Sequence, residues 1–165
     1  MILIAYASKK GSVREVAESI GAWLHEHGFE VDVRSAREVK GLDGVDGVIL
    51  GGSLYMGRWH ADAHRFLKRH REQLSRIPMA VYGMGPLQLE EKQVQGSRAQ
   101  LDRALGRHRE LKPVAVAIFG GVIDPAKLHF PFNRMPAGDA RDWDAIRAWA
   151  LETAPQVGGR VAQPH

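Results

Sequence analysis

Cysteine is absent from the 165 residues of this chain. Its absence excludes disulfides, thiolate metal sites, iron–sulfur clusters and cysteine nucleophiles. A redox function would therefore have to place its electrons on a non-covalently bound cofactor. The absence of cysteine also agrees with a reducing compartment, and we expect a cytoplasmic protein.

Long apolar runs are missing as well. No stretch approaches the ~20 apolar residues that a membrane-spanning helix needs. Residues 1–7 lack the basic segment and cleavage site of a signal peptide, so we expect their apolar run to form a buried strand. With 44% hydrophobic and 25% charged residues, the composition is typical of a soluble globular domain. The net charge of +4 favours an anionic partner, such as a phosphorylated cofactor, a membrane surface or nucleic acid.

Strand-like and helix-like segments alternate along the chain. We predict strands at 2–7, 29–34, 48–50, 79–82 and 114–119, and helices at 13–27, 63–77, 90–109 and from 142 onward. This alternation predicts a doubly wound α/β domain with a five-stranded parallel sheet in the order 2-1-3-4-5. We expect one domain over residues 1–155 and a loose C-terminal tail over 156–165.

Two segments rich in glycine and serine follow the first and third predicted strands. They read SKKGS at 8–12 and GGSLYMG at 51–57. In a doubly wound sheet, ligands bind where the strand order reverses, which here is the gap between these two strands. Hydroxyls, glycine and unpaired helix N–H groups can hold a phosphate, and Lys9 and Lys10 add positive charge. The alternative is an ordinary turn in which Ser12 caps the helix.

Residues 2–20, ILIAYASKKGSVREVAESI, resemble the opening of flavodoxins, whose phosphate loop usually reads Ser/Thr-x-Thr-Gly-x-Thr. Ser8 and Gly11 match the first hydroxyl and the glycine. Lys10 and Val13 stand where the other two threonines would be. The resemblance implies a flavodoxin-like sandwich that binds FMN.

A second resemblance points to one branch of this superfamily. Residues 51–70, GGSLYMGRWHADAHRFLKRH, resemble the menaquinone-dependent protoporphyrinogen dehydrogenases, and residues 119–150 resemble the wider family of flavodoxin-domain proteins. The matching positions in the first stretch are Gly51, Ser53, Leu54, Gly57, Trp59 and His60. This similarity implies a quinone as one candidate electron acceptor.

The resemblance implies that three segments hold FMN. We expect the phosphate at Ser8, Lys9, Lys10, Gly11, Ser12 and Val13, one side of the ring at Ser53, Leu54, Tyr55, Met56, Gly57 and Trp59, and the other side at Gly83, Met84, Gly85 and Pro86. Tyr55 and Trp59 would offer aromatic faces to the flavin. The alternative for Trp59 is an anchor for the helix that follows, and the alternative for Gly57 is a simple turn glycine.

Other patterns indicate partners. His60 and His64 have a spacing used by metal sites, but no third ligand is near in sequence, and we expect no metal.

The basic run at 64–71 is either a solvated helix surface or a contact for an anionic membrane or an acidic redox partner. No nucleic-acid motif accompanies it, so we expect no nucleic-acid binding. The apolar stretch 129–135 could cover the flavin, accept a planar substrate, form a homodimer contact or pack on the core.

The leading hypothesis is an FMN-binding redox protein that exchanges electrons with a partner protein or a quinone. One alternative is a quinone-dependent, protoporphyrinogen dehydrogenase-like enzyme of haem biosynthesis. A flavin-free binding or regulatory domain that keeps the fold is the other, and Lys10 and Val13 favour it. Peripheral contact with the inner face of the membrane is compatible with both redox hypotheses.

Overall fold

The computed structural model describes residues 1–8, 11–86, 88–123, 134 and 137–158. The strands are β1 (Ile2–Ala7), β2 (Val31–Ser35), β3 (Gly47–Tyr55), β4 (Arg58–Trp59), β5 (Met79–Met84), β6 (Ala115–Phe119), β7 (Val122–Ile123) and β8 (Gly138–Asp139). The helices are α1 (Ser12–Glu26), α2 (Ala61–Arg69), α3 (Arg71–Leu74), α4 (Glu91–Leu105) and α5 (Trp143–Gly158), with short 3-10 turns η1 (Ala36–Glu38) and η2 (Gly106–His108).

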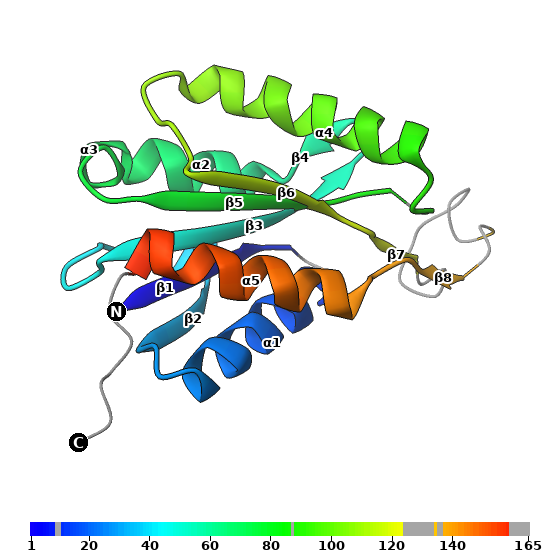
Figure 1. Cartoon of the computed structure of the whole chain (residues 1–165). Coiled ribbons are helices and arrows are strands. Elements are labelled where there is room, and N and C mark those ends of the chain that lie inside the picture. Colours follow the sequence, from blue (N-terminus) through cyan, green and yellow to red (C-terminus); the bar gives the residue numbers. More distant parts are fainter. Residues whose placement is uncertain (9–10, 87, 124–133, 135–136, 159–165) are drawn as a thin grey trace.

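The five main strands form one parallel sheet in the order β2-β1-β3-β5-β6. This is the predicted order, because β5 and β6 are the fourth and fifth of the main strands. Helices α1 and α5 cover one face of the sheet, and α2, α3 and α4 cover the other (Figure 1). The strand order reverses between β1 and β3, whose carboxyl ends lie side by side.

The helices follow from their sequence patterns. Apolar residues of α1 recur at helical spacing, and Val13, Val16 and Ile20 are all fully buried. The helix ends in a Schellman motif, in which Gly28 adopts a φ of 86° and the N–H of Phe29 donates to the carbonyl of Leu24. Glycine is needed there because the left-handed backbone disfavours a Cβ.

The segment 51–60 differs from the predicted loop. Strand β3 continues to Tyr55, and a tight turn at Met56 and Gly57 leads into β4, which pairs antiparallel with β3. Met56 and Gly57 both have positive φ angles, 52° and 76°, as a two-residue hairpin of type I′ requires. The usual asparagine or aspartate before the glycine is absent, so the sequence carries little signal for this hairpin.

Two other boundaries also differ. Helix α5 passes Pro155 and runs to Gly158, three residues beyond the predicted domain end. Residues 159–165 of the predicted tail lie outside the described residues. The helix predicted at 90–109 is α4 followed by the tighter turn η2.

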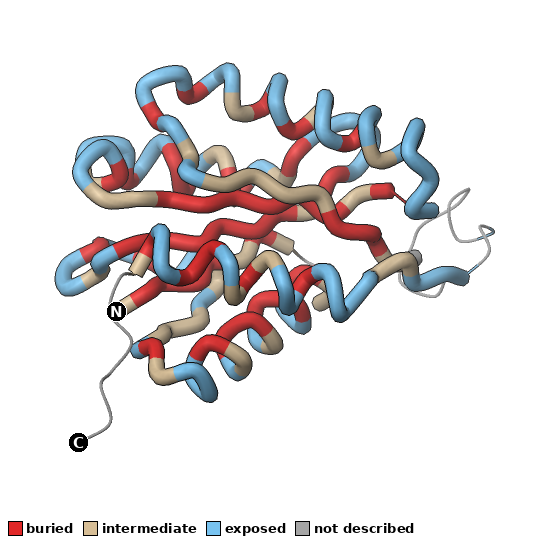
Figure 2. Tube along the Cα trace, in the orientation of Figure 1, coloured by how far each residue is buried: buried red, intermediate tan, exposed pale blue. Residues whose placement is uncertain are grey.

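Two hydrophobic layers sandwich the sheet (Figure 2). One packs α1 and α5 against it and includes Ile4, Ile20 and Tyr82, whereas the other packs α2 and α4 and includes Leu50, Phe66 and Leu101. Central parallel strands are buried on both faces, which explains their nearly continuous apolar sequences.

Gly51 allows the closest packing at the centre of the sheet. A Cβ at this position would lie 1.9 Å from Cζ of Tyr82, whose ring is enclosed by Phe119 and Trp149. We therefore expect Gly51→Ala to lower the free energy of unfolding by about 1–3 kcal/mol through overpacking. Urea denaturation measures this change.

Gly96 provides the matched control. It is exposed in the middle of α4, and a Cβ there would meet no atom within 4 Å. Gly96→Ala should raise the free energy of unfolding by about 0.5–1 kcal/mol, because alanine is the better helix former. Equal effects of the two substitutions would contradict the packing at Gly51.

Candidate functional site

The first turn of α1 lies at the carboxyl end of β1, beside the end of β3. Gly11 precedes the helix with φ 83° and ψ −19°, and the N–H of Glu15 donates to its carbonyl. In this described helix no side chain caps the N-terminus. A left-handed residue followed by helical ones turns successive N–H groups toward one point, where an anion can bind.

Space is available at this turn. A Cβ built on Gly11 would meet no atom within 4 Å, so the region in front of the glycine is open. Ser8 and Ser12 are half-buried beside it. The alternative role of Ser12 as the helix cap is wrong, because Gly11 is the capping residue. Lys9 and Lys10 lie outside the described residues.

Val13 contributes differently from a threonine. Its side chain is fully buried in the layer under α1 and α5, on the same stripe as Val16 and Ile20. The side chain therefore faces the core, and only the backbone N–H of Val13 is left to serve a phosphate. A valine side chain offers no hydroxyl to a ligand at this position.

The end of β3 and the hairpin form the next part of the site. Ser53 is half-buried and Leu54 is buried, whereas Tyr55 and Met56 are 52% and 71% exposed at the tip. Exposed large apolar side chains are available to cover a planar ligand. Gly57 is exposed and occupies the second turn position.

Trp59 does not have the predicted role. It is only 3% exposed, and its Nε1 donates to the carbonyl of Gly52 at 3.2 Å. A Cβ on Gly52 would lie 2.5 Å from this nitrogen. Because the indole is enclosed in the core, it has no free face for a flavin, and the expectation of stacking is corrected to a structural anchor. The adjacent His60 caps α2, with its Nδ1 accepting from the N–H of Asp62.

The segment after β5 is already hydrogen-bonded within the protein. Gly83 and Met84 are the last two residues of the strand and are buried. The N–H of Gly85 donates to the carbonyl of Phe119, and the carbonyl of Pro86 accepts from Gly121. Since proline has no N–H and the N–H of Gly85 is already engaged, neither residue offers a backbone donor to a ligand in this conformation.

Arg141 is a neighbour of the site that the motif analysis did not select. Its guanidinium donates to Glu15 in the first turn of α1 and to Asp139 in β8, at 2.8 and 2.7 Å. It also lies 4.8 Å from the ring centroid of Trp143. The hydrogen bonds that Arg141 donates lower the pKa of the Asp139 carboxyl, and its positive charge adds to this effect. These contacts fix the start of α5 against the first turn of α1.

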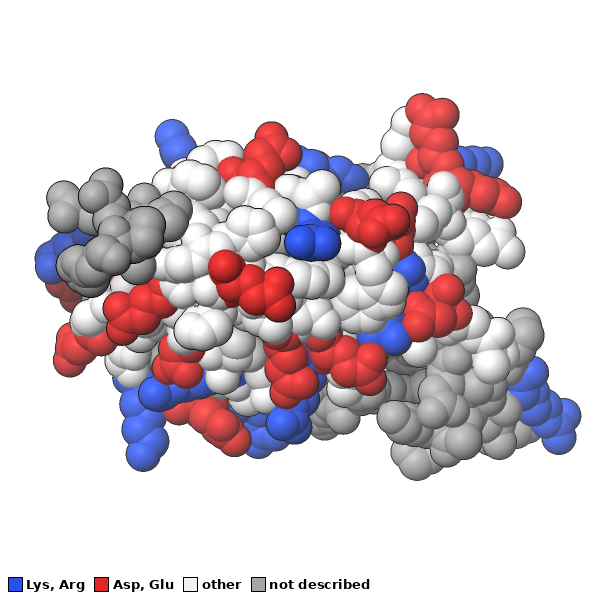
Figure 3. All heavy atoms as spheres, turned by 60° about the horizontal axis from the view of Figure 1, so that its bottom comes forward, with Lys and Arg blue, Asp and Glu red and all other residues white. Residues whose placement is uncertain are grey.

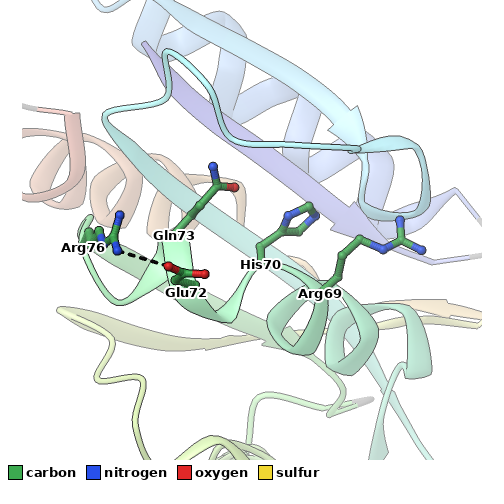
Figure 4. A pocket seen from close by; sticks show the side chains of 5 residues that line it. All are labelled: Arg69, His70, Glu72, Gln73 and Arg76. Carbon is green, nitrogen blue, oxygen red and sulfur yellow. Dashed lines mark hydrogen bonds and ion pairs between the residues drawn. The ribbon is translucent and has the colours of Figure 1, made fainter.

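A pocket of about 380 Å³ lies at the opposite, amino-terminal edge of the sheet (Figure 4). Its lining residues are Arg69, His70, Glu72, Gln73 and Arg76. Apart from Arg69, its polar side chains are engaged in structural contacts, and Arg76 pairs with Glu72. Nε2 of His70 lies 3.2 Å from the carbonyl of Val39, and Gln73 accepts from the N–H of Leu42. These hydrogen bonds join α3 and the residue before it to the segment before β3. The pocket is remote from the predicted site.

Within the described part of the chain, no group of three or more His, Asp or Glu residues could hold a metal ion. No helix among these residues is long and apolar enough to cross a bilayer.

Comparison with known proteins identifies the family and some relatives. The model of the flavodoxin domain matches residues 3–135. Protoporphyrinogen IX dehydrogenase [quinone] of Escherichia coli K12 is 29% identical over 84 residues, and the same enzyme of strain O157:H7 matches equally. The match covers 50% of this chain and 46% of each enzyme, so the chain spans less than half the length of these curated relatives.

Solved structures agree on the fold. Oxidised flavodoxin 2 from Bacillus cereus has a TM-score of 0.54 at 23% identity, covering 94% of this chain and 98% of that one. A mutant of flavodoxin from Pseudomonas aeruginosa has a TM-score of 0.58 at 18% identity, covering 94% of this chain and 97% of that one. Fusobacterium nucleatum flavodoxin bound to flavin mononucleotide has a TM-score of 0.52 at 17% identity, covering 94% of this chain and 98% of that one. With its family model matching most of its length, this chain belongs to the flavodoxin-domain family.

Proposed function

We propose that this protein binds FMN at the carboxyl edge between β1 and β3 and acts as a redox protein. The observation that carries the proposal is the left-handed Gly11 before the uncapped start of α1, at the point where the strand order reverses. The positive end of the helix dipole favours a phosphate there. Family membership and the FMN-bound relative from Fusobacterium support the same cofactor.

The residues present fit this cofactor. The open turn at Gly11 and the N–H groups of Ser12 and Val13 would hold the phosphate, with the hydroxyls of Ser8 and Ser12 nearby. Tyr55 and Met56 would cover the ring from the hairpin. When bound, FMN supplies one- or two-electron transfer, whereas the protein supplies binding, orientation and exclusion of water.

Gly11→Ala tests the phosphate turn. Alanine at a φ of 83° costs about 1–2 kcal/mol, and relaxation of the turn would move its N–H groups away from the phosphate. Loss of one charge-assisted hydrogen bond is worth about 1.5–3 kcal/mol, so we expect the FMN dissociation constant to rise at least ~10-fold. Titration of the apoprotein, followed by flavin fluorescence, gives the constant.

Gly44→Ala is the matched control. Gly44 also has a positive φ, 77°, and a Cβ there would meet no atom within 4 Å, but the residue lies before β3 at the other edge of the sheet. It should lose similar stability without losing FMN affinity. Equal losses of affinity would refute the assignment, and an apoprotein that takes up no FMN would favour the flavin-free alternative.

A quinone-linked dehydrogenase is the second candidate function, supported by the 29% identity to protoporphyrinogen IX dehydrogenase [quinone]. We expect the FMN-loaded protein to oxidise protoporphyrinogen IX anaerobically when a water-soluble menaquinone analogue is present. Porphyrin fluorescence measures the product. A rate no higher than that of the Gly11→Ala apoprotein would leave electron transfer to a partner protein as the function.

Charge separates the two faces of the molecule and supports contact with a membrane. Residues 58–112 contain twelve Lys and Arg against six Asp and Glu, whereas residues 11–46 and 138–158 together contain six against twelve. Acidic side chains accordingly spread over the side of α1 and α5 (Figure 3). The basic face consists of exposed residues that form no ion pair with a carboxylate within the described residues: Arg58, Lys68, Arg69, Lys92, Arg103, Arg107, Arg109 and Lys112.

Anionic lipid attracts each such cation by about 1 kcal/mol, while the acidic face would be repelled. The basic face would therefore turn toward the lipid, where a quinone is dissolved. We expect co-sedimentation with vesicles of phosphatidylglycerol and phosphatidylcholine that weakens as salt rises, because screening acts on exposed charges.

Lys68→Glu/Arg69→Glu should reduce the partition coefficient by ~30-fold or more through the loss of two cations. Arg147→Glu is the control, since Arg147 is exposed on α5 within the acidic side. Binding that is indifferent to the double substitution, or to the phosphatidylglycerol content, would exclude this contact.

A further inference from the structure

Two histidines from distant segments form a hydrogen-bonded pair beside the hairpin. Nδ1 of His64 in α2 lies 2.8 Å from Nε2 of His108 in η2, and their rings stack with centroids 5.1 Å apart at 27°. Two imidazole nitrogens can share this contact only if one carries a proton and the other does not. The pair is therefore broken when both rings are protonated.

Neighbouring groups determine where the protons are. Arg107 approaches Nε2 of His64 at 3.5 Å, and a guanidinium can only donate. Nε2 of His64 is thus the acceptor, and its Nδ1–H donates to Nε2 of His108. The proton of His108 then resides on Nδ1, which is buried without a hydrogen-bond partner. Both imidazoles are neutral in this arrangement.

The pair supports the hairpin through Trp59. The ring of His64 meets the indole edge-to-face, with centroids 5.6 Å apart at 78°. The indole in turn donates to Gly52, and Trp59 pairs with Leu54 across the hairpin. A continuous set of contacts therefore leads from η2 through α2 to the β3–β4 hairpin, whose tip contains Tyr55 and Met56.

We propose that His64 and His108 are positioning residues, whose neutral pair holds the β3–β4 hairpin against the proposed flavin site and releases it in acid. The proposal rests on the proposed function for its effect on FMN, but the effect on the hairpin itself is independent of flavin.

The charges around the pair determine the direction of the pH effect. His64 faces Trp59, His108 and Arg107, while His108 also lies within the field of Lys68 in α2, Arg71 in α3 and Glu110 after η2. Burial, together with the charge of Arg107, lowers the pKa of His64 from 6.5 to about 4, and burial with Arg107 also lowers that of His108. Because the released state binds protons more readily, the closed state loses stability as the pH falls from about 6.5 toward 4.

Hydrogen exchange of the hairpin peptide 54–60 tests the proposal in the flavin-free protein. After correction for intrinsic rates, we expect its protection to fall between about pH 7 and 4.5, while a peptide within α1 stays protected and excludes global unfolding. His64→Asn/His108→Gln is the key variant. Its amides replace the same donor and acceptor positions but do not titrate, so hairpin protection should become independent of pH.

Three other variants complete the test. His108→Leu removes the acceptor and should expose the hairpin even at neutral pH, with FMN affinity ~5- to 10-fold weaker, as the loss of one hydrogen bond implies. His108→Gln should restore that affinity. His25→Gln on the exposed side of α1 should leave the pH profile unchanged.

The outcomes separate the two proposals. Acid-sensitive protection without any FMN uptake would refute the flavin site but support the histidine pair. Hairpin protection that does not depend on pH in the unmodified protein would overturn the proposed acid release by the histidine pair. An equal pH response in the double variant would overturn it as well. A hairpin that opens while FMN affinity stays constant would overturn its positioning role.

Discussion

Two adjacent glycines at the centre of β3 are the constraint on which the sheet packing depends. Successive residues of a strand point to opposite faces. The ring of Tyr82 occupies the side-chain position of Gly51 within the layer under α1 and α5, and the indole of Trp59 occupies that of Gly52 in the layer under α2 and α4. Any side chain at either position would compete with an aromatic ring for the same volume.

This packing also shapes the candidate site. Because the indole of Trp59 is tied to the Gly52 carbonyl, β4 folds back on β3, and the turn at Met56 and Gly57 projects from the sheet. Tyr55 and Met56 are exposed because they occupy the tip of this hairpin, whereas Trp59 in β4 is buried. Across the edge, Gly85 and Pro86 are fixed by hydrogen bonds to the last residue of β6 and to Gly121. The phosphate turn, by contrast, depends on the local backbone at Gly11.

The separation of charge between the two faces is independent of this core. Several ion pairs within the described residues join two exposed side chains, such as Arg98 with Asp102, and each of these contributes roughly 0–1 kcal/mol to stability. Their distribution affects the orientation of the protein toward charged partners more than its folding. A redox protein with an acidic and a basic face can expose its flavin edge in a defined direction relative to an anionic surface.

The sequence alone determined the order of the strands, the positions of the helices and the location of the glycine turn before α1. These features depend on local periodicity, on Gly11 and on the right-handed crossovers of parallel strands. Tertiary structure decided the roles of individual side chains. Trp59 was buried rather than stacked, Val13 turned its side chain to the core, and His64 met His108 from 44 residues away. Such contacts join segments that are distant in the chain, so no local pattern contains them, and only packing at the level of atoms selects among the alternatives.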